Sequence, residues 1–408
     1  MTALLSSRAF ADGAFPDSMG ILLPLDQPNR IIASTNFGLL VSEDDGTTWS
    51  WVCEEAVGVN TFLHQLGAPP NDLMVALSVD GLTYSNDFGC SWHRSNLATA
   101  YVDDAFPDAV NPSRVYALIR GSSGMLQISA DGAQTFGPPV LTTIGDEHFS
   151  GVENARSSPQ TVYLTLYTLQ PTVHPYIARS TDGGQTWARP FFDPGSTFDS
   201  HSVRLAAVDP ENANKLYLRL ANIATGGESL GIFEASLGTL RIAYSLPAPM
   251  SAFLRRSNGQ IIVAARDGSA FISADGGATF AAWPNAPHLR ALGERNGVLY
   301  AVGDNFLDGF AVARSRDQGA TWQPLIRFEQ LTGPKSCGDL ANICAGPWLR
   351  LRNTLGLSPD AGAPAAGNDA KPRSGCSQSA VPQGVFSVSA LILAIVAVRL
   401  MAAGRRDR

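Results

Sequence analysis

The pattern Ser-x-Asp-x-Gly-x-Thr followed by Trp or Phe recurs six times along the chain, and this repetition constrains the fold more than any other feature. The copies lie at 42–49, 85–92, 129–136, 180–187, 273–280 and 315–322, with Ala133 replacing Gly and Ser91 replacing Thr once each. Their first serines are 43, 44, 51, 93 and 42 residues apart. Because 93 is about two periods, we predict a seventh unit near residues 203–246 that has lost its motif.

A period of about 45 residues fits one four-stranded blade of a β-propeller. In the first unit, β-prone runs at 19–23, 30–34 and 39–42 precede the motif, and a run at 49–53 follows it. Turn dipeptides separate such runs, and no long segment with helical apolar periodicity occurs before residue 338. We therefore predict an all-β, seven-bladed β-propeller over residues 14–332, with each motif in the turn between the third and fourth strands.

The chemistry of the motif is structural. A short acidic side chain accepts several backbone N–H groups of a tight turn, glycine tolerates positive φ, and the closing aromatic ring packs between sheets. We expect the motif aspartates to be buried in turns and hydrogen-bonded to backbone N–H groups; they are Asp44, Asp87, Asp131, Asp182, Asp275 and Asp317. A calcium loop is the alternative. Each motif supplies one regular carboxylate, whereas calcium takes six or more oxygen ligands, so we expect no metal.

The motif resembles the Asp-box, or BNR repeat, of sialidases, sortilin-type receptors and photosystem II assembly factors. The resemblance covers roughly residues 14–330 and implies a propeller whose motif turns lie on the outer rim, away from the central channel. It does not determine an activity, because one fold hosts many unrelated functions.

Ligands of propellers usually bind at the channel mouth, on the loops that lead into the innermost strands. Polar residues of those loops are the candidate ligand-binding residues Asp103, Asp146, Glu147, His148, Asp199 and His201. They favour a polar cup for a surface protein or a glycan, with histidine and carboxylate groups able to hold a cation. The alternative is that polar side chains only line a water-filled channel.

The resemblance to sialidases raises an enzyme hypothesis, a sialidase-like exo-glycosidase. It implies three arginines that clamp a carboxylate, a Tyr–Glu pair as nucleophile and an Asp as acid/base. The family's first-blade Phe-Arg-Ile-Pro segment is replaced by Met-Gly-Ile-Leu-Leu-Pro at 19–24, which leaves Arg204, Arg255 and Arg290 as the candidate clamp. Glu153 and Tyr163 share a unit, but ordinary strand residues explain them equally well.

No Ser/His/Asp order, phosphate loop or dinucleotide glycine motif is present. We therefore nominate no catalytic residue, expect no cofactor, and favour a non-enzymatic binding protein. Lys and Arg total 29 against 36 Asp and Glu, a net charge of −7, which argues against nucleic acid as a partner.

Five cysteines bear on the cellular compartment. Neighbouring blades would bring Cys53 and Cys90 together, and Cys337 and Cys344 are seven residues apart, so we predict these two disulfides. One alternative is metal binding, although neither pair has Cys-x-x-Cys spacing. The other is that the cysteines are reduced thiols in the core. Two pairs with Cys376 left over favour an oxidising compartment.

The tail predicts a membrane anchor. After a Cys-stapled extension at 333–357, the segment 358–380 is a Pro/Ala/Gly-rich linker containing Gly375-Cys376, and 381–408 combines an apolar run with terminal arginines. If the Arg399 side chain snorkels to the membrane surface, the apolar run reaches the ~20 residues that a single transmembrane helix needs. The order resembles the myxobacterial sorting signal MYXO-CTERM, which implies processing near Cys376 and anchoring at the cell surface. An uncut anchor is the alternative.

The N-terminal segment, residues 1–13, is interpreted as the remnant of a signal peptide or as disordered. Ala9-Phe-Ala11 matches an Ala-x-Ala cleavage site, although the preceding stretch is too short for a full signal. We expect the true start codon to lie upstream and the protein to be exported to the cell envelope. A cytosolic, tail-anchored protein is the alternative.

Overall fold

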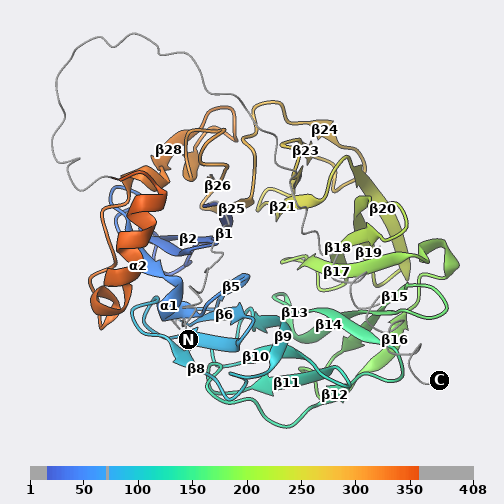
Figure 1. The fold of residues 1–408 in the computed structure, drawn as a ribbon. Helices are drawn as coiled ribbons and strands as arrows, with labels where there is room; N and C mark the ends of the chain where they lie inside the picture. Colours follow the sequence, from blue (N-terminus) through green and yellow to red (C-terminus); the bar gives the residue numbers. More distant parts are fainter. Residues whose placement is uncertain (1–15, 70–72, 358–408) are drawn as a thin grey trace, which may run out of the picture.

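The computed structural model describes residues 16–69 and 73–357, and these form seven four-stranded antiparallel sheets arranged around a central axis (Figure 1). The predicted all-β, seven-bladed propeller is confirmed. In every blade the strands pair in chain order, with the first strand innermost and the fourth at the rim (Figure 1). A propeller of this kind needs only local meanders, which is what the short runs and turn dipeptides encode.

The first four blades contain β1 (Ser18–Leu22), β2 (Ile31–Thr35), β3 (Gly38–Ser42) and β4 (Ser50–Cys53); β5 (Leu63–Leu66), β6 (Met74–Ser78), β7 (Gly81–Ser85) and β8 (His93–Arg94); β9 (Tyr101–Pro107), β10 (Val115–Arg120), β11 (Met125–Ser129) and β12 (Leu141–Thr142); β13 (His148–Ala155), β14 (Ser158–Thr168), β15 (His174–Ser180) and β16 (Ala188–Phe192).

The last three contain β17 (His201–Val208), β18 (Lys215–Asn222), β19 (Glu228–Glu234) and β20 (Thr239–Leu246); β21 (Met250–Arg255), β22 (Ile261–Ala265), β23 (Ala270–Ser273) and β24 (Ala281–Ala282); β25 (Ala291–Arg295), β26 (Val298–Val302), β27 (Val312–Ser315) and β28 (Gln323–Ile326). The unit without a motif is therefore the complete fifth blade, in which residues 235–238 join β19 to β20.

The meander gives the disc two different faces. The face where the chain enters each innermost strand is called the leading face, and it also carries the loops between the second and third strands. The opposite face carries the six motif turns and is called the motif face. The prediction that the motif joins the third and fourth strands is confirmed.

The core lies between neighbouring blades. Val75 of β6 packs with Val102 and Val115 of the third blade, and Tyr116 packs with Leu164 of the fourth. The second strands β2, β6 and β22 are buried along their whole length because a blade stands on each side of them. This explains why they read as continuous apolar runs instead of alternating ones.

The motif turn is held by a serine and an aspartate together, as the copy at 180–187 shows. The Ser180 hydroxyl donates to Asp182 Oδ1 at 2.7 Å and accepts the Gly184 N–H at 2.9 Å. Asp182 Oδ1 also accepts the Thr186 N–H at 2.9 Å, and Oδ2 accepts the Thr186 hydroxyl. Gly183 and Gly184 have φ of 74° and 92°, which explains the glycines. The equivalent bonds recur in the other five copies.

The expectation that the motif aspartates are buried is wrong. All six are exposed, whereas the six motif serines are at most 2% exposed. The carboxylate spans the turn from outside, where water solvates its remaining lone pairs, while the serine hydroxyl reaches the inner N–H of the turn. Hydrogen bonds from the side chain and backbone of Thr186 hold the pKa of Asp182 well below its usual range.

A Ser180→Ala variant is expected to lower the free energy of unfolding by about 1–3 kcal/mol, because the buried Gly184 N–H loses its acceptor and Asp182 loses a donor. Urea unfolding of the purified protein measures this. The neighbouring exposed Thr181→Ala is the control, with an expected change within about 0.5 kcal/mol. Equal effects of the two variants would show that the serine does not hold the turn.

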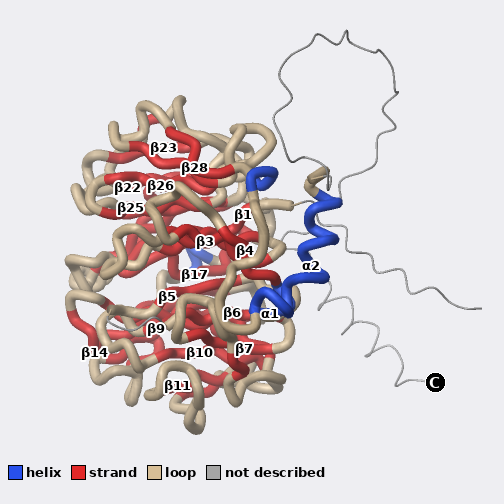
Figure 2. The backbone as a smooth tube through the Cα atoms, turned by 90° about the vertical axis from the view of Figure 1, so that its left-hand side faces the viewer, coloured by secondary structure: helices blue, strands red, loops and turns tan. Residues whose placement is uncertain are grey.

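The C-terminal extension returns from the last blade to the first. After a short 3-10 turn at Phe328–Gln330, the chain runs parallel to β4, where the Trp51 N–H donates to Gly333 O and the Lys335 N–H donates to Trp51 O. Helix α2 (Leu340–Thr354) then packs against β4 and the short helix α1 (Glu54–Val57), beside the disc (Figures 1 and 2). The first and last blades exchange no strand, so the extension bridges the point where the ring closes.

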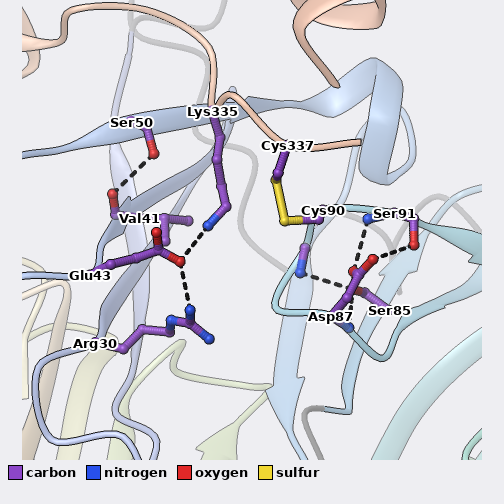
Figure 3. The surroundings of a disulfide bond; sticks show 11 residues. Arg30, Val41, Glu43, Ser50, Ser85, Asp87, Cys90, Ser91, Lys335 and Cys337 are labelled. Carbon is purple, nitrogen blue, oxygen red and sulfur yellow. Dashed lines mark hydrogen bonds and ion pairs between the residues drawn. A yellow bond between two sulfur atoms is a disulfide. The ribbon is translucent and has the colours of Figure 1, made fainter. Parts of the chain in front are cut away.

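The predicted disulfide pairing is wrong, although all four cysteines are disulfide-bonded. The bonds are Cys53–Cys344 and Cys90–Cys337. The extension follows the rim of the first blade, so Cys337 meets the motif turn of the second blade (Figure 3). Cys344, on α2, is buried against Cys53. Nearby, Lys335 donates to Glu43, which also accepts from Arg30, adding polar contacts between the extension and the first blade (Figure 3).

No helix within residues 16–69 and 73–357 is long and apolar enough to cross a membrane. The predicted signal remnant, linker, Cys376 and C-terminal anchor lie outside the described residues.

Candidate functional site

Equivalent positions of successive blades meet around the channel mouth of the leading face. The first residue of each innermost strand faces the end of the second strand, which pairs Tyr101 with Arg120 in the third blade and His148 with Tyr167 in the fourth. In the fifth blade the same position pairs His201 with Asn222. The loops chosen from the sequence therefore do lie on one face, over the third to fifth blades.

Three of the predicted carboxylates are occupied by local partners. Asp103 accepts hydrogen bonds from the Arg120 guanidinium, one of them at 3.1 Å. Asp146 accepts the backbone N–H groups at 169 and 170 and so fixes the loop after β14. Glu147 accepts from the Tyr176 hydroxyl, the Arg189 guanidinium and the backbone N–H at 144. Each of these carboxylates therefore already has hydrogen-bond partners within the protein.

Asp199 forms a contact that the sequence did not reveal. Its Oδ1 lies 2.6 Å from His174 Nδ1, and His174 Nε2 lies 3.0 Å from Asp193 Oδ1. Burial opposes protonation of His174, but the hydrogen bonds that its ring donates to the two aspartates outweigh it and raise its pKa. His201 is held by the Phe198 carbonyl and by Asn222 at 3.3 Å. His174 begins β15, whereas both aspartates lie in the connection between β16 and β17, so no local pattern marks the contact.

The predicted residues thus form separate pairs instead of one cup. Within the described part of the chain, no group of three or more His, Cys, Asp or Glu side chains is arranged to hold a metal ion.

Four rings and one guanidinium from three neighbouring blades lie on this face, and the set is called the aromatic–arginine strip (Phe62, Tyr101, Arg120, Tyr167 and His148). Phe62 and Tyr101 stack with centroids 6.5 Å apart, and Arg120 lies 4.5 Å above the Tyr101 ring. Tyr167 stacks on His148 at 5.4 Å. Burial raises the pKa of Tyr167, and the charge of the nearby Arg120 partly offsets that rise.

The strip is accessible, since Phe62 is 37% and Tyr101 38% exposed. Further exposed apolar side chains stand on loops of the same face: Val59, Val79, Ile144, Phe306 and Leu307. Single exposed apolar residues are ordinary, but Tyr, Phe and Arg together on a rigid frame are the composition of binding hot spots. The sequence-based search took only polar residues from these loops and so missed the aromatic ones.

The three arginines of the enzyme hypothesis do not converge. Arg290 precedes β25 at the leading face, where it pairs with Asp17 and Asp304. Arg255 is the last residue of β21, at the opposite end of the neighbouring innermost strand, and pairs with acids of the fifth blade. A strand advances about 3.3 Å per residue, so five residues separate the two guanidinium groups by more than a shared carboxylate can bridge. Arg204 pairs weakly with Asp104 at 3.7 Å.

Two carboxyl groups, Asp104 of β9 and Glu153 of β13, lie on the innermost strands of the third and fourth blades. Burial raises the pKa of Asp104 and raises that of Glu153 to about 8, so Glu153 holds its proton at neutral pH. Asp104 accepts the Val152 N–H and Glu153 accepts the Val208 N–H, each across a blade boundary. Tyr163 bonds instead to the carbonyl of residue 213, so Glu153 and Tyr163 are not paired.

His64 of β5 is a buried histidine, 7% exposed, and neither ring nitrogen has a hydrogen-bond partner. Burial lowers its pKa to about 4, from 6.5. Between pH 6.5 and 4 the unfolded chain binds a proton that the folded chain does not, so stability is lost as pH falls through this window.

The difference between the folded and unfolded pKa values of His64 corresponds to about 3 kcal/mol of stability. When pH falls from 7 to 4, a His64→Leu variant is therefore expected to lose about 3 kcal/mol less stability than the parent. Urea unfolding at a series of pH values measures it, since all other groups titrate equally in both proteins. Val79→Ala, at an exposed position of the same blade that does not titrate, is the control and should retain the parent's pH dependence. A His64→Leu profile parallel to the parent's would contradict the account.

No family model matches the chain, and no curated protein does. Among solved structures, the GH74 xyloglucanase from Xanthomonas campestris superposes with a TM-score of 0.56 at 15% identity, over 77% of this chain and 55% of its own. An ancestral GH74 enzyme gives 0.55 at 13% identity, over 76% and 46%. YCF48 from Cyanidioschyzon merolae gives 0.51 at 14% identity, over 74% and 96%.

The chain thus spans about half the length of the two GH74 enzymes. At these identities the likeness concerns the propeller fold alone. Neighbours of the fold include glycoside hydrolases as well as YCF48, so the fold does not determine the function.

Proposed function

We propose that this chain is an exported, surface-anchored propeller of the Asp-box type that binds a partner protein through the aromatic–arginine strip and catalyses no reaction. The observation that carries the proposal is the strip itself, an accessible run of rings around Arg120 on a rigid disc. Aromatic residues and arginine dominate protein-binding hot spots because they bury much area with few rotatable bonds.

A protein partner is favoured over a glycan by the aliphatic residues beside the strip. Val59 and Val79 are exposed on the loops next to Phe62 and would be buried only by another apolar surface. Asp103 and His148, which the sequence nominated, take supporting places: Asp103 orients Arg120, and His148 stacks under Tyr167. Asp146, Glu147, Asp199 and His201 shape the adjoining loops.

The absence of catalysis is supported by how the charged groups are used. Among the described residues, the arginines of the glycosidase hypothesis each have their own acidic partners, and Glu153 and Tyr163 bond to different backbone groups. Turnover of a fluorogenic sialoside by the purified protein would contradict this part of the proposal.

Export is supported by the two disulfides, which persist in oxidising compartments. Anchoring is proposed from the linker, the Gly375-Cys376 pair and the apolar C-terminal run. Cell fractionation tests it: a Cys376→Ser variant is expected to change both mass and membrane distribution. If the variant and the parent match in both, the sorting-signal proposal fails.

The strip is tested by affinity capture from the cell envelope of the producing organism, with quantitative mass spectrometry. We expect at least one envelope protein whose recovery falls tenfold or more in a Tyr101→Ser/Arg120→Ser variant. A Leu237→Ser/Arg316→Ser variant, which alters still more exposed residues of the motif face, is the control. Equal recovery by all three proteins would contradict the proposal. Recovery abolished by periodate but not by prior proteolysis of the envelope would identify a glycan instead.

A further inference from the structure

His174, the first residue of β15, contacts a carboxylate with each of its two ring nitrogens. Nδ1 lies 2.6 Å from Asp199 Oδ1, and Nε2 lies 3.0 Å from Asp193 Oδ1. Both aspartates belong to the connection 193–200, which crosses the leading face and leads into the innermost strand β17. Because Asp193 begins this connection and Asp199 nearly ends it, one ring joins both of its ends to β15.

The chemistry of the ring selects its protonation state. A neutral imidazole has one N–H, so it donates to one carboxylate while its other nitrogen presents a lone pair to the second. The imidazolium donates from both nitrogens. The two contacts together therefore require the charged form. Burial opposes that charge, but the hydrogen bonds to Asp199 and Asp193 outweigh it and raise the pKa of His174.

Other contacts hold mainly the second half of the connection 193–200. The Phe198 side chain is buried between the fourth and fifth blades, and the Ser200 N–H donates to Val173 O at 2.6 Å. Ser200 has a φ of 67°, which a residue with a side chain rarely adopts, so the connection depends on these anchors. Residues 195–197 are exposed. Loss of the Asp193 contact would therefore loosen the first half of the connection while Phe198 keeps the second half in place.

Other charged groups on the elements packed against β15 have partners of their own. They are Arg189 bonded to Glu147, Arg204 paired with Asp104, Asp146 bonded to the backbone N–H groups at 169 and 170, and His201 facing the backbone carbonyls of 198 and 199. The two aspartates of the connection are therefore the charges that decide the state of the His174 ring.

We propose that His174 is a pH-sensitive switch for the connection 193–200: the imidazolium holds both ends against β15, and the neutral ring releases Asp193. The neutral ring keeps one N–H, and Asp199 retains it because this carboxylate is closer and less exposed than Asp193. The second contact is present while the ring is charged, below 6.5, and is lost as pH rises through the higher pKa of the folded state.

The switch is separate from the aromatic–arginine strip. His174 pairs with Thr168, whereas Tyr167 of the strip pairs with Pro175. Successive side chains of a strand point to opposite faces, so the strip lies on one side of this sheet and the His174 ring on the other. The inference therefore does not depend on the function proposed for the strip.

Long-range ¹H–¹⁵N correlation spectra of the histidine rings across a pH series test the protonation state, and a His174→Gln variant identifies the signal of this ring. We expect a titration midpoint above 6.5, with the remaining proton on Nδ1 at higher pH. Asp193→Asn should lower the midpoint by about one pH unit, because it removes one of the two charges that favour the imidazolium. Asp26→Asn, which removes the same charge at an exposed position of the motif face, is the control and should leave the midpoint unchanged.

Hydrogen exchange read by mass spectrometry measures the consequence for the connection. Protection of the backbone N–H groups at 195–200, corrected for the intrinsic exchange rate, should fall about threefold or more between pH 6 and 8.5, while that of the central strand β18 stays constant. His174→Gln, which cannot carry the charge, should show the lower protection at both pH values. A midpoint at or below 6.5, protection that does not respond to pH, or a response that His174→Gln shares with the parent would each overturn the proposal.

Discussion

Replacing Cys53 and Cys90 together by alanine is expected to lower the free energy of unfolding by about 4–8 kcal/mol, since a disulfide typically contributes about 2–4 kcal/mol. The bonds join residues 291 and 247 positions apart and so restrict the unfolded chain strongly. They also hold the extension where it bridges the first and last blades, which exchange no strand. Urea unfolding with and without a reductant measures the loss.

The two single variants separate the bonds. Each should lose less than the double variant, and Cys376→Ala, outside both pairs, should match the parent. With the reductant present, the parent should approach the double variant. If the reductant leaves the parent's free energy of unfolding unchanged, the two disulfides do not stabilise the closure of the ring.

A Glu294→Ala variant is expected to cost about 3–5 kcal/mol, because it leaves the buried Arg256 charge without a counter-charge. Arg256 is 1% exposed and donates to Glu294 Oε1 at 2.8 Å and to Gln260 at 2.7 Å. Burial opposes ionisation of Glu294, but hydrogen bonds from the Ser257 N–H and from Arg256 outweigh it and lower its pKa. The pair joins the sixth blade to the seventh.

The matched control is the double replacement Arg256→Met/Glu294→Leu, measured in the same urea titration. An apolar pair of similar volume removes the uncompensated charge, so this variant should be more stable than Glu294→Ala. If the double variant loses at least as much stability as the single one, the cost does not arise from an unpaired buried arginine.

The fold could be predicted because the repeat records local geometry. Serine and aspartate stand at fixed places in all six motif turns, and glycine does so in all but the third, where Ala133 replaces it. The distance between successive motifs corresponds to the four strands of one blade. The silent fifth blade was found by the same spacing. The exposure of the aspartates was not foreseen, because the sequence shows which groups bond in a turn but not which of them faces the solvent.

The path of the extension and the composition of the site depend on contacts between distant segments. The cysteine pairing follows from the parallel run of the extension along β4, which no local pattern encodes. The polar candidates lie on the expected face, yet partners such as Arg120 and His174 come from other strands and occupy them. The strip assembles from three blades, so its residues look like ordinary strand aromatics in the sequence.

Site-specific photo-crosslinking in the producing cells tests the central claim, binding at the leading face, most directly. A photoreactive phenylalanine analogue replaces Phe62 of the strip or, as control, the exposed Leu237 of the motif face. The account predicts one discrete protein adduct from position 62 that disappears when Tyr101 and Arg120 are replaced by serine, and none from position 237. An adduct at position 237 alone, or one at position 62 that survives those replacements, would contradict it.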